Sequence, residues 1–180
     1  MPYRFAMLAA AGLLALTACA TRPPTPKAAA APFDLVRDLC GATTARGEFS
    51  TIFGARRGFN ATLEGRLEGQ TFVLTEQFAF DDGEKDVKTW RLTPAGPGRW
   101  TGTREDVVGT AVGYIDGNAF RLEYLVDIKR KNGKSTRVRF RDVLVRTSSG
   151  IVLNKAIVSY FGAPIGKVEL TISRTATAGT

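Results

Sequence analysis

The sequence predicts an all-β fold, a single up-and-down antiparallel barrel of about eight to ten strands with a short helix before it. Glycine-marked breaks recur every eight to twelve residues after Gly41, and no later stretch has helical periodicity. Between the breaks, apolar and polar residues alternate, as they do in strands that bury one face. So many consecutive hairpins with one apolar face must close, both to bury that face and to remove their edges.

Ten runs are predicted as strands, and they span residues 48–53, 57–67, 71–80, 86–92, 99–103, 110–115, 119–128, 135–146, 151–160 and 167–173. The clearest inward faces consist of Phe59, Ala61, Leu63 and Leu67; Phe72, Leu74, Phe78 and Phe80; and Phe120, Leu122, Tyr124, Val126 and Ile128. Tight turns are predicted at Glu68-Gly69, Asp82-Gly83, Asp116-Gly117 and Asn132-Gly133. Such a lipocalin-like barrel is either filled by side chains or holds one small ligand.

The N-terminus has the pattern of an export signal, predicted to span residues 1–18. Arg4 precedes an apolar run over residues 5–16, which is too short to cross a bilayer. The run ends in Leu16-Thr17-Ala18-Cys19, which resembles a lipobox, so we expect Cys19 to be acylated. The alternative is an ordinary cleaved signal with an incidental cysteine. Because Ala20 follows in place of an aspartate, we expect a lipid anchor in the outer membrane, on its periplasmic face.

The remaining chain is predicted to form one domain. Residues 19–32 are rich in Pro and Ala and are expected to be a flexible tether behind the anchor. Residues 33–175 form the barrel domain, and 176–180 a disordered tail. Cys40 has no disulfide partner once Cys19 is acylated, and its spacing from Phe33 and Leu39 predicts a small buried side chain after a short helix.

The charge of the chain is basic. The formal net charge is +8, and loss of Arg4 with the leader gives 24 − 17 = +7. The basic residues are spread along the chain, so solubility explains most of them and no nucleic-acid partner is expected. Arg137, Arg139 and Arg141 are the exception, because they share one strand face. That face could meet an acidic protein partner or phospholipid head groups.

The composition argues against several kinds of catalysis. The chain has no histidine, which removes the usual general base and the nucleophile pairs built on it. No P-loop, Gly-x-Gly-x-x-Gly or Gly-x-Ser-x-Gly motif is present. We therefore expect a protein that is not an enzyme, with no catalytic residue, no metal and no cofactor.

Two carboxylates fall on apolar stripes and are expected to point inward. Glu76 shares its face with Phe78, and Asp142 shares its face with Phe140. A buried carboxylate needs a partner. One reading pairs the two with Lys88, Arg104 or Lys155; the other has them line a cavity and hold the polar end of an amphipathic ligand.

The candidate ligand-binding residues combine these carboxylates with neighbouring aromatic and polar side chains. They are Glu76, Asp142, Phe72, Phe78, Phe120, Tyr124, Asn154 and Trp90. Two of them have structural alternatives, because Asn154 could form a cross-strand hydrogen bond and Trp90 could close the end of the barrel.

Several ordered stretches resemble a known family over nearly the whole folded part. They are EGR at 64–66, FAFDDGE at 78–84, Trp90 with Leu92, GRWTG at 98–102, DVVGTAVG at 106–113, GNA at 117–119 and VLNKAIVSYFGAPIGKVEL at 152–170. The chain looks like a member of the domain-of-unknown-function 3833 family, small proteobacterial envelope lipoproteins without an established activity. Family members tend to be encoded near lipid-modifying enzymes, which implies a lipid-related role. A departure is Val143-Leu144, where the family more often has an aromatic residue followed by Met.

The leading hypothesis is therefore a lipid-anchored barrel that binds or carries a hydrophobic molecule, a fatty acid or a lipid. The second is a filled barrel that supports a membrane lipid-modifying enzyme as a structural or interaction module. A third is a hydrolase or isomerase that uses Glu76 and Asp142, although no residue marks a nucleophile. A void of a few hundred Å³ lined by Phe72, Phe78, Phe120 and Tyr124 would favour the first hypothesis over the second.

Overall fold

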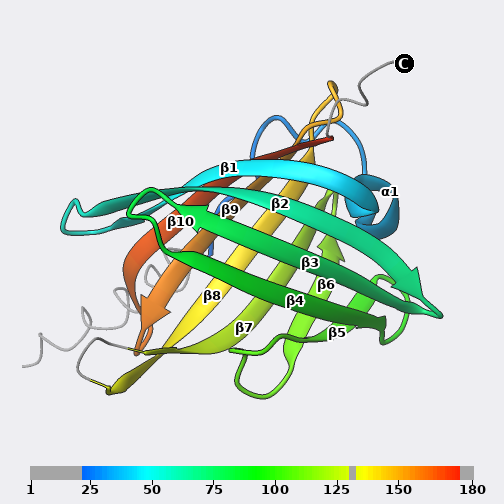
Figure 1. Cartoon of the computed structure of the whole chain (residues 1–180). Helices are drawn as coiled ribbons and strands as arrows, with labels where there is room; N and C mark the ends of the chain where they lie inside the picture. The colour runs from blue at the N-terminus through cyan, green and yellow to red at the C-terminus, as the bar shows by residue number, and fades with distance from the viewer. Residues whose placement is uncertain (1–21, 130–132, 175–180) are drawn as a thin grey trace, which may run out of the picture.

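The computed structural model of the chain is a closed antiparallel barrel of ten strands in the order β1-β10-β9-β8-β7-β6-β5-β4-β3-β2 (Figure 1). The structure describes residues 22–129 and 133–174. Its elements are α1 (Leu35–Leu39), β1 (Gly41–Thr51), β2 (Arg56–Glu68), β3 (Thr71–Phe80), β4 (Lys85–Pro94), β5 (Arg99–Thr103), β6 (Ala111–Asp116), β7 (Ala119–Lys129), β8 (Ser135–Arg146), β9 (Val152–Tyr160) and β10 (Ala163–Arg174). The predicted fold class, an up-and-down lipocalin-like barrel with a short helix, is confirmed.

The strand bounds follow the alternation of the sequence closely. β3, β5 and β8 have the predicted limits, whereas β1 and β10 begin seven and four residues earlier than expected, at Gly41 and Ala163. The early part of β1 was missed because its inward residues are small. A side chain at Gly47 would overlap Phe59, so the strand buries backbone there and shows no apolar stripe.

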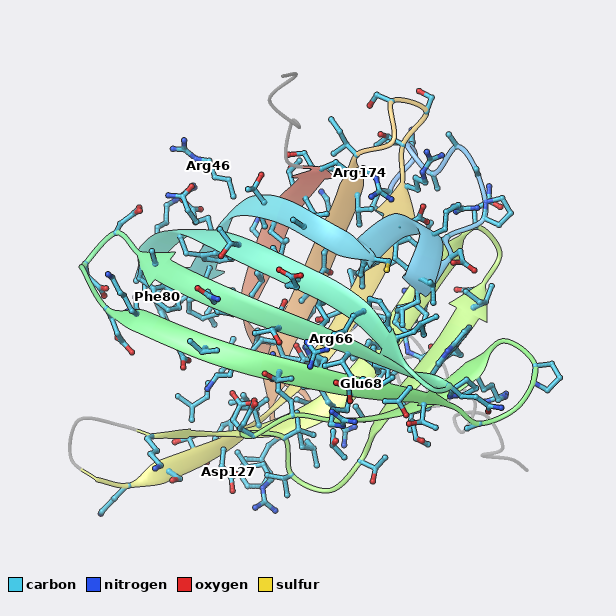
Figure 2. All side chains as sticks on the ribbon, turned by 45° about the vertical axis from the view of Figure 1, so that its right-hand side comes forward. Arg46, Arg66, Glu68, Phe80, Asp127 and Arg174 are labelled. Atoms are coloured by element: carbon cyan, nitrogen blue, oxygen red, sulfur yellow. The ribbon has the colours of Figure 1, made fainter. Side chains whose placement is uncertain are left out.

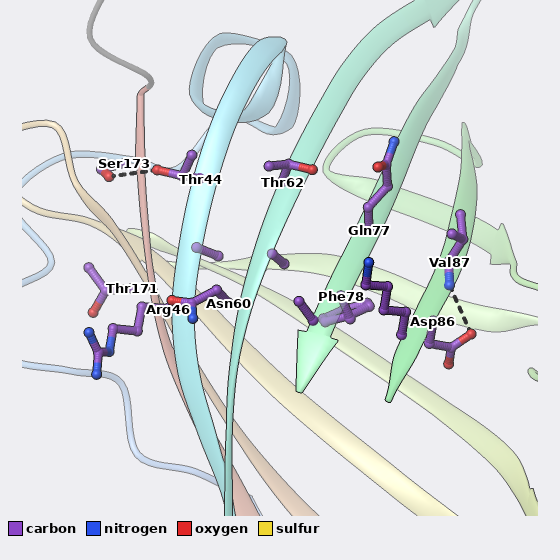
Figure 3. Close-up of a pocket in the computed structure, with 14 residues that line it drawn as sticks. Thr44, Arg46, Asn60, Thr62, Gln77, Phe78, Asp86, Val87, Thr171 and Ser173 are labelled. Atoms are coloured by element: carbon purple, nitrogen blue, oxygen red, sulfur yellow. Dashed lines mark hydrogen bonds between the residues drawn. The ribbon is translucent and has the colours of Figure 1, made fainter. Parts of the chain in front are cut away.

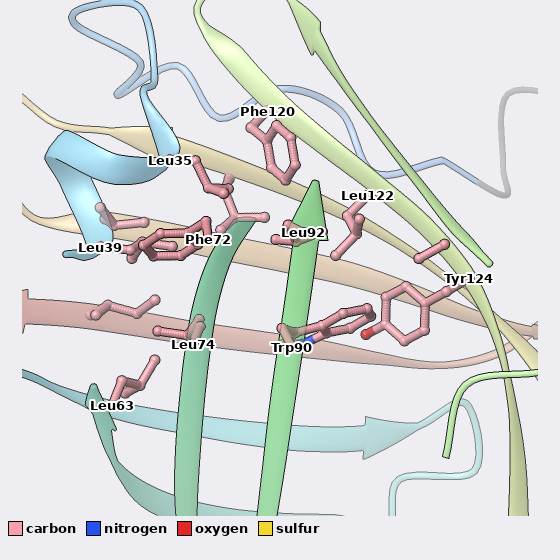
Figure 4. Close-up of a cluster of buried hydrophobic side chains, with 14 of the residues drawn as sticks. Leu35, Leu39, Leu63, Phe72, Leu74, Trp90, Leu92, Phe120, Leu122 and Tyr124 are labelled. Atoms are coloured by element: carbon pink, nitrogen blue, oxygen red, sulfur yellow. The ribbon is translucent and has the colours of Figure 1, made fainter. Parts of the chain in front are cut away.

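One end of the barrel is closed by α1. Asp34 caps the helix by accepting a hydrogen bond from the backbone N–H of Arg37 at 2.7 Å. Leu35 and Leu39 are buried and pack into the core, as Figure 4 shows. Cys40 follows the helix and is half-buried, less enclosed than its spacing predicted.

The other end is the mouth of the barrel, which the strands reach at the C-terminal ends of β1, β3, β7 and β9. Ile128 near the end of β7 is 42% exposed, and Leu67 at the opposite, closed end is 50% exposed. The alternation predicts both in the interior. Ile128 does line the cavity, at its mouth, whereas the interior position predicted for Leu67 is wrong. The alternation gives the correct face in each case, but these strands extend past the rims of the barrel.

The outer surface is covered with charged side chains that pair across neighbouring strands. Arg66 and Glu68 of β2, which lie side by side in Figure 2, form an ion pair at 2.7 Å, and Arg91 of β4, on the far side of β3, reaches the same carboxylate group at 2.8 Å. Because these pairs are exposed to solvent and screened by salt, each contributes little to stability. Their main consequence is that the outer face of the barrel is polar while the inner face is apolar.

The barrel wall changes character between β4 and β7. Within the described chain, β4 pairs with β5 through residues 91–94 alone, and the mouthward half of β4 meets the connection that follows β5. In that connection the Glu105 carboxylate accepts the backbone N–H of Thr89 at 3.0 Å. Val108 donates its N–H to the carbonyl of Leu125 on β7 at 2.8 Å. The connection thus completes the wall where no strand does.

The segment before α1 packs against the barrel. Arg22 forms an ion pair with Glu123 at 2.7 Å, and the Arg121 guanidinium donates to the carbonyl of Pro23 at 3.0 Å. Ala30 donates its N–H to the carbonyl of Arg146 at 3.0 Å. From Arg22 onward the segment therefore differs from the unpacked tether that the composition predicted. Cys19, the predicted signal and the predicted tail lie outside the described residues.

Candidate ligand-binding cavity

A cavity of about 480 Å³ occupies the barrel interior. It runs from Phe80 and Ile128 at the mouth to Leu35 and Leu39 of the helix at the closed end. Figure 4 shows several of its apolar walls, including Trp90 beside Tyr124. Most of its lining is apolar, which is typical of a site for a hydrophobic small molecule.

A larger hollow of about 810 Å³ lies on the outside of the barrel, across β10, β1, β2, β3 and β4 (Figure 3). Its lining includes short, exposed polar side chains such as Thr44, Thr62 and Gln77. Despite its size it is more open to solvent than the interior cavity and offers less apolar surface to a ligand. The enclosed interior cavity is the better candidate site.

The cavity has a polar belt at mid-height, which we define as Glu76, Arg104, Tyr124, Asp142 and Asn154. Asp142 on β8 is only 7% exposed, and the Tyr124 hydroxyl donates a hydrogen bond to its Oδ2 at 3.2 Å. Burial raises the pKa of Asp142 to about 7, although Arg104 and the hydrogen bonds from Tyr124 and Asn154 act to lower it. Near neutral pH this carboxyl group is therefore balanced between its two protonation states.

Glu76 on β3 faces the same space. Its Oε2 lies 3.9 Å from Nη1 of Arg104, which is ion-pair distance but too long for a hydrogen bond. Burial raises the pKa of Glu76 to about 7, the positive charge of Arg104 lowers it, and the negative charge of Asp142 raises it further. The two carboxyl groups are thus electrostatically coupled, and protonation of one favours ionisation of the other.

Arg104 enters the cavity from the connection after β5. Its Nε donates to Oδ1 of Asp106 at 2.7 Å, and its guanidinium lies over the rings of Trp90 (4.7 Å) and Tyr124 (5.2 Å). Burial acts to lower the pKa of Arg104, but Tyr124, Asp106 and Glu76 together raise it above its ordinary value. Arg104 is therefore a permanent cation held mainly by Asp106.

The polar belt contains acceptors that the described side chains and backbone leave without a donor. They are Oε2 of Glu76, Oδ1 of Asp142 and Oδ1 of Asn154. All three atoms are buried. Since native interiors leave few buried polar atoms unpaired, these atoms mark the place where a bound molecule would complete the site.

The structure brings seven of the eight candidate residues to the cavity: Glu76, Asp142, Phe78, Phe120, Tyr124, Asn154 and Trp90. Phe72 is not among the lining residues. It packs at the closed end beside Gly65, where even a methyl group on the glycine would lie 2.9 Å from its ring. Helix α1 covers this level of the barrel, and the sequence did not show how deep the helix would sit.

The expected partners of the carboxylates divide into two groups. Arg104 approaches Glu76, and Lys88 lines the cavity, paired with Asp86 at 3.0 Å. Lys155 is on the outer face, 2.8 Å from Glu169, so its predicted internal role is wrong. Its neighbours Asn154 and Ala156 both line the cavity, and the two-residue period already places Lys155 on the opposite face.

The arginine face of β8 is largely neutralised by the neighbouring β7. Arg137 binds Asp127, labelled in Figure 2, with two hydrogen bonds of 2.8 Å. Arg141 pairs with Glu123 at 3.1 Å. An acidic partner at this face therefore stays a prediction from the sequence, without further support from the surface.

Neither a metal cluster nor a membrane-spanning helix is found in the part of the chain that the structure describes. In residues 22–129 and 133–174, no three His, Cys, Asp or Glu side chains are grouped so that they could hold a metal ion. Over the same ranges, no helix has the length and apolar character needed to cross a bilayer.

The fold and the cavity define a small up-and-down β-barrel protein with a ligand-sized interior. The chain belongs to the family described as "Protein of unknown function (DUF3833)", which it matches over residues 13–174. A search among curated proteins found no match.

Three solved structures show the same fold at low sequence identity. The S-type phycobiliprotein lyase CPES from Guillardia theta has a TM-score of 0.59 and 9% identity, over 78% of this chain and 90% of the lyase. Rv2717c from M. tuberculosis has a TM-score of 0.52 and 14% identity, over 80% and 99% of the two chains. A DUF3598-family protein of unknown function from Nostoc punctiforme has a TM-score of 0.51 and 14% identity, over 84% of this chain and 52% of that one.

Proposed function

We propose that this protein binds an amphipathic ligand, a fatty acid or another lipid-like molecule, in the barrel cavity and does not transform it. The observation that carries the proposal is an apolar cavity of about 480 Å³ with unpaired buried oxygens at its centre. The apolar walls suit a hydrocarbon chain, and the polar belt suits one polar group. Its volume lies within the range of about 300–1,000 Å³ that is usual for small-molecule sites.

The cavity also separates this proposal from its alternatives. A barrel that served as a filled structural module would have side chains in the space that Phe78, Phe120 and Tyr124 surround. For hydrolysis or isomerisation, Glu76 and Asp142 could exchange protons near neutral pH. The belt presents no hydroxyl or thiol nucleophile next to them apart from the Tyr124 hydroxyl, whose pKa burial raises well above its ordinary value.

We further propose that the protein works at the envelope membrane, anchored through an acylated Cys19. The rim of the mouth supports this placement. Phe53 and Phe161, at the tips of the β1–β2 and β9–β10 hairpins, are 91% and 92% exposed. The two hairpins touch, because Ile52 donates its N–H to the carbonyl of Ile165 at 3.1 Å. Large exposed apolar side chains that lie together mark interaction surfaces.

Filling the cavity is expected to abolish binding without changing the outer surface. Ala156 on β9 is 4% exposed and lines the cavity, so Ala156→Phe would occupy the space of a ligand. We expect affinity for the neutral dye N-phenyl-1-naphthylamine to fall by about tenfold or more, as measured by fluorescence titration.

The matched control is Ile157→Phe, which adds a ring to the next residue on the outer face and should leave binding unchanged. Thermal unfolding of both variants checks that they fold. Native mass spectrometry of the wild-type protein, purified from its own membranes, identifies any resident molecule. Protein that is reproducibly empty and does not bind the dye would contradict the proposed function.

The anchor is tested separately from the cavity. In cells grown with labelled palmitate, wild-type protein is expected to incorporate label and to sediment with membranes, whereas Cys19→Ala should do neither. Because Cys40 provides a second thiol, Cys40→Ala is the matched control and should retain the label. The lipoprotein proposal fails if the wild type takes up no label and Cys19→Ala still fractionates with membranes.

A further inference from the structure

The buried polar atoms of the belt that have no hydrogen-bond partner are all acceptors. Its three unpaired atoms are all oxygens, and they come from three strands: Glu76 on β3, Asp142 on β8 and Asn154 on β9. Each such atom destabilises the protein when it is buried without a partner, and more so when it is charged. A ligand that supplied donors would remove that destabilisation.

The donors already present in the belt make no hydrogen bond to these three oxygens. The Tyr124 hydroxyl donates to Asp142 at 3.2 Å, through the other carboxylate oxygen. The Arg104 guanidinium donates to Asp106 at 2.7 and 3.3 Å and stays 3.9 Å from Glu76. The site therefore offers an incoming polar group three unpaired oxygens, beside Nη1 of Arg104.

The charged groups of the cavity lining include one more carboxyl group than cations. Its carboxyl groups are those of Glu76, Asp86, Asp106 and Asp142, and its cations are those of Arg57, Lys88 and Arg104. The cations are already paired: Arg57 with Asp82 and Glu84 on the rim, Lys88 with Asp86, and Arg104 with Asp106. When both are ionised, Glu76 and Asp142 are the least compensated groups, and one further positive charge would balance the site.

We propose that the natural ligand carries its polar end as an ammonium group, which sits between Glu76, Asp142 and Asn154 while its apolar chain fills the cavity. An ammonium group has three N–H donors and one positive charge, matching three unpaired oxygens and the charge deficit. A free carboxylate would instead bring two more acceptors and a negative charge. This inference rests on the proposed function and narrows its ligand from a fatty acid or another lipid-like molecule to a long-chain amine, which excludes the fatty acid.

Three ligands with the same chain and different head groups test the inference: dodecylammonium, dodecan-1-ol and dodecanoate. Displacement of N-phenyl-1-naphthylamine is measured at pH 8, below the micelle concentration of each ligand. We expect dodecylammonium to bind about tenfold or more tightly than dodecanoate, with the alcohol between them. The formal net charge of +8 favours anions at the outer surface, so a preference for the cation would come from the cavity.

Variants then locate the preference. Asp142→Asn and Glu76→Gln should each weaken dodecylammonium binding and leave dodecan-1-ol binding nearly unchanged. Glu64→Gln is the matched control, because it makes the same change in charge at an exposed position of β2. If the belt variants do not fold, the wild-type comparison of the three ligands still decides the question.

The outcomes separate this inference from the proposed function. Tighter binding of dodecanoate, or equal binding of all three, would overturn the ammonium assignment and leave a binder of hydrophobic chains. Failure of all three ligands to displace the dye, from protein that is also empty on isolation, would overturn the proposed function itself.

Discussion

The protein is expected to be more stable at pH 5 than at pH 8 by about 2–5 kcal/mol. Glu76 and Asp142 have a pKa of about 7 in the folded state against ordinary values of 4.5 and 3.8. A group whose pKa rises on folding stabilises the protein fully below its unfolded pKa, and this contribution is lost as the pH rises through the folded pKa. The loss should therefore fall between about pH 4 and pH 7. Urea unfolding at a series of pH values measures it.

Other carboxylates act in the opposite direction but at lower pH. Hydrogen bonds from Arg137 and Arg91 lower the pKa values of Asp127 and Glu68, so their stabilisation is lost only as the pH falls through those lowered values. It is largely retained at pH 5. The double variant Glu76→Gln, Asp142→Asn should flatten the profile between pH 5 and pH 8, whereas Asp127→Asn should not. A wild-type free energy of unfolding that rises toward pH 8 would contradict the raised pKa values of these two buried carboxyl groups.

Gly65→Val is expected to destabilise the protein by about 2–3 kcal/mol or more and to loosen the closed end. A Cβ atom at Gly65 would overlap the backbone carbonyl oxygen of Leu39 and lie 2.9 Å from the Phe72 ring. The strand cannot move away, because Gly65 pairs with Gly41 on one side and Leu74 on the other. Helix α1 must therefore give way. Urea unfolding measures the stability, and dye titration measures the accompanying loss of ligand retention.

The matched control for this change is Glu64→Val, on the exposed side of the same strand. It introduces the same side chain where there is room, so its effect should stay within about 0.5 kcal/mol of zero. Equal effects of the two substitutions would mean that the contact between β2 and α1 does not hold the end of the barrel closed.

The fold could be read from the sequence because alternation specifies which side of a strand is buried. Runs such as residues 71–80 and 135–146 match β3 and β8 to the residue. Glu76 and Asp142 could be placed inside for the same reason, since each interrupts an otherwise apolar stripe. The interior position of a strand residue is thus a local property.

The composition of the polar belt was harder to predict, because it depends on contacts between distant segments. Arg104 belongs to a connection without periodicity, and only the closed wall shows that it faces Glu76. Phe72 was misplaced because the depth of the cavity depends on where α1 sits. Lys155 is a different case. It directly follows Asn154 in a predicted strand, so the sequence alone places the two side chains on opposite faces.

The side of the barrel between β4 and β7 is built from the connection after β5, with a Glu105 side chain in place of a strand partner for Thr89. Local opening starts where the backbone is held by the fewest hydrogen bonds. This flank lies directly beside Arg104 and Asp106, so we expect a brief opening there to bring water to the belt while the helix keeps the opposite end shut. Glu76 and Asp142 would then exchange protons with bulk solvent even if a hydrocarbon chain of the proposed ligand blocked the mouth.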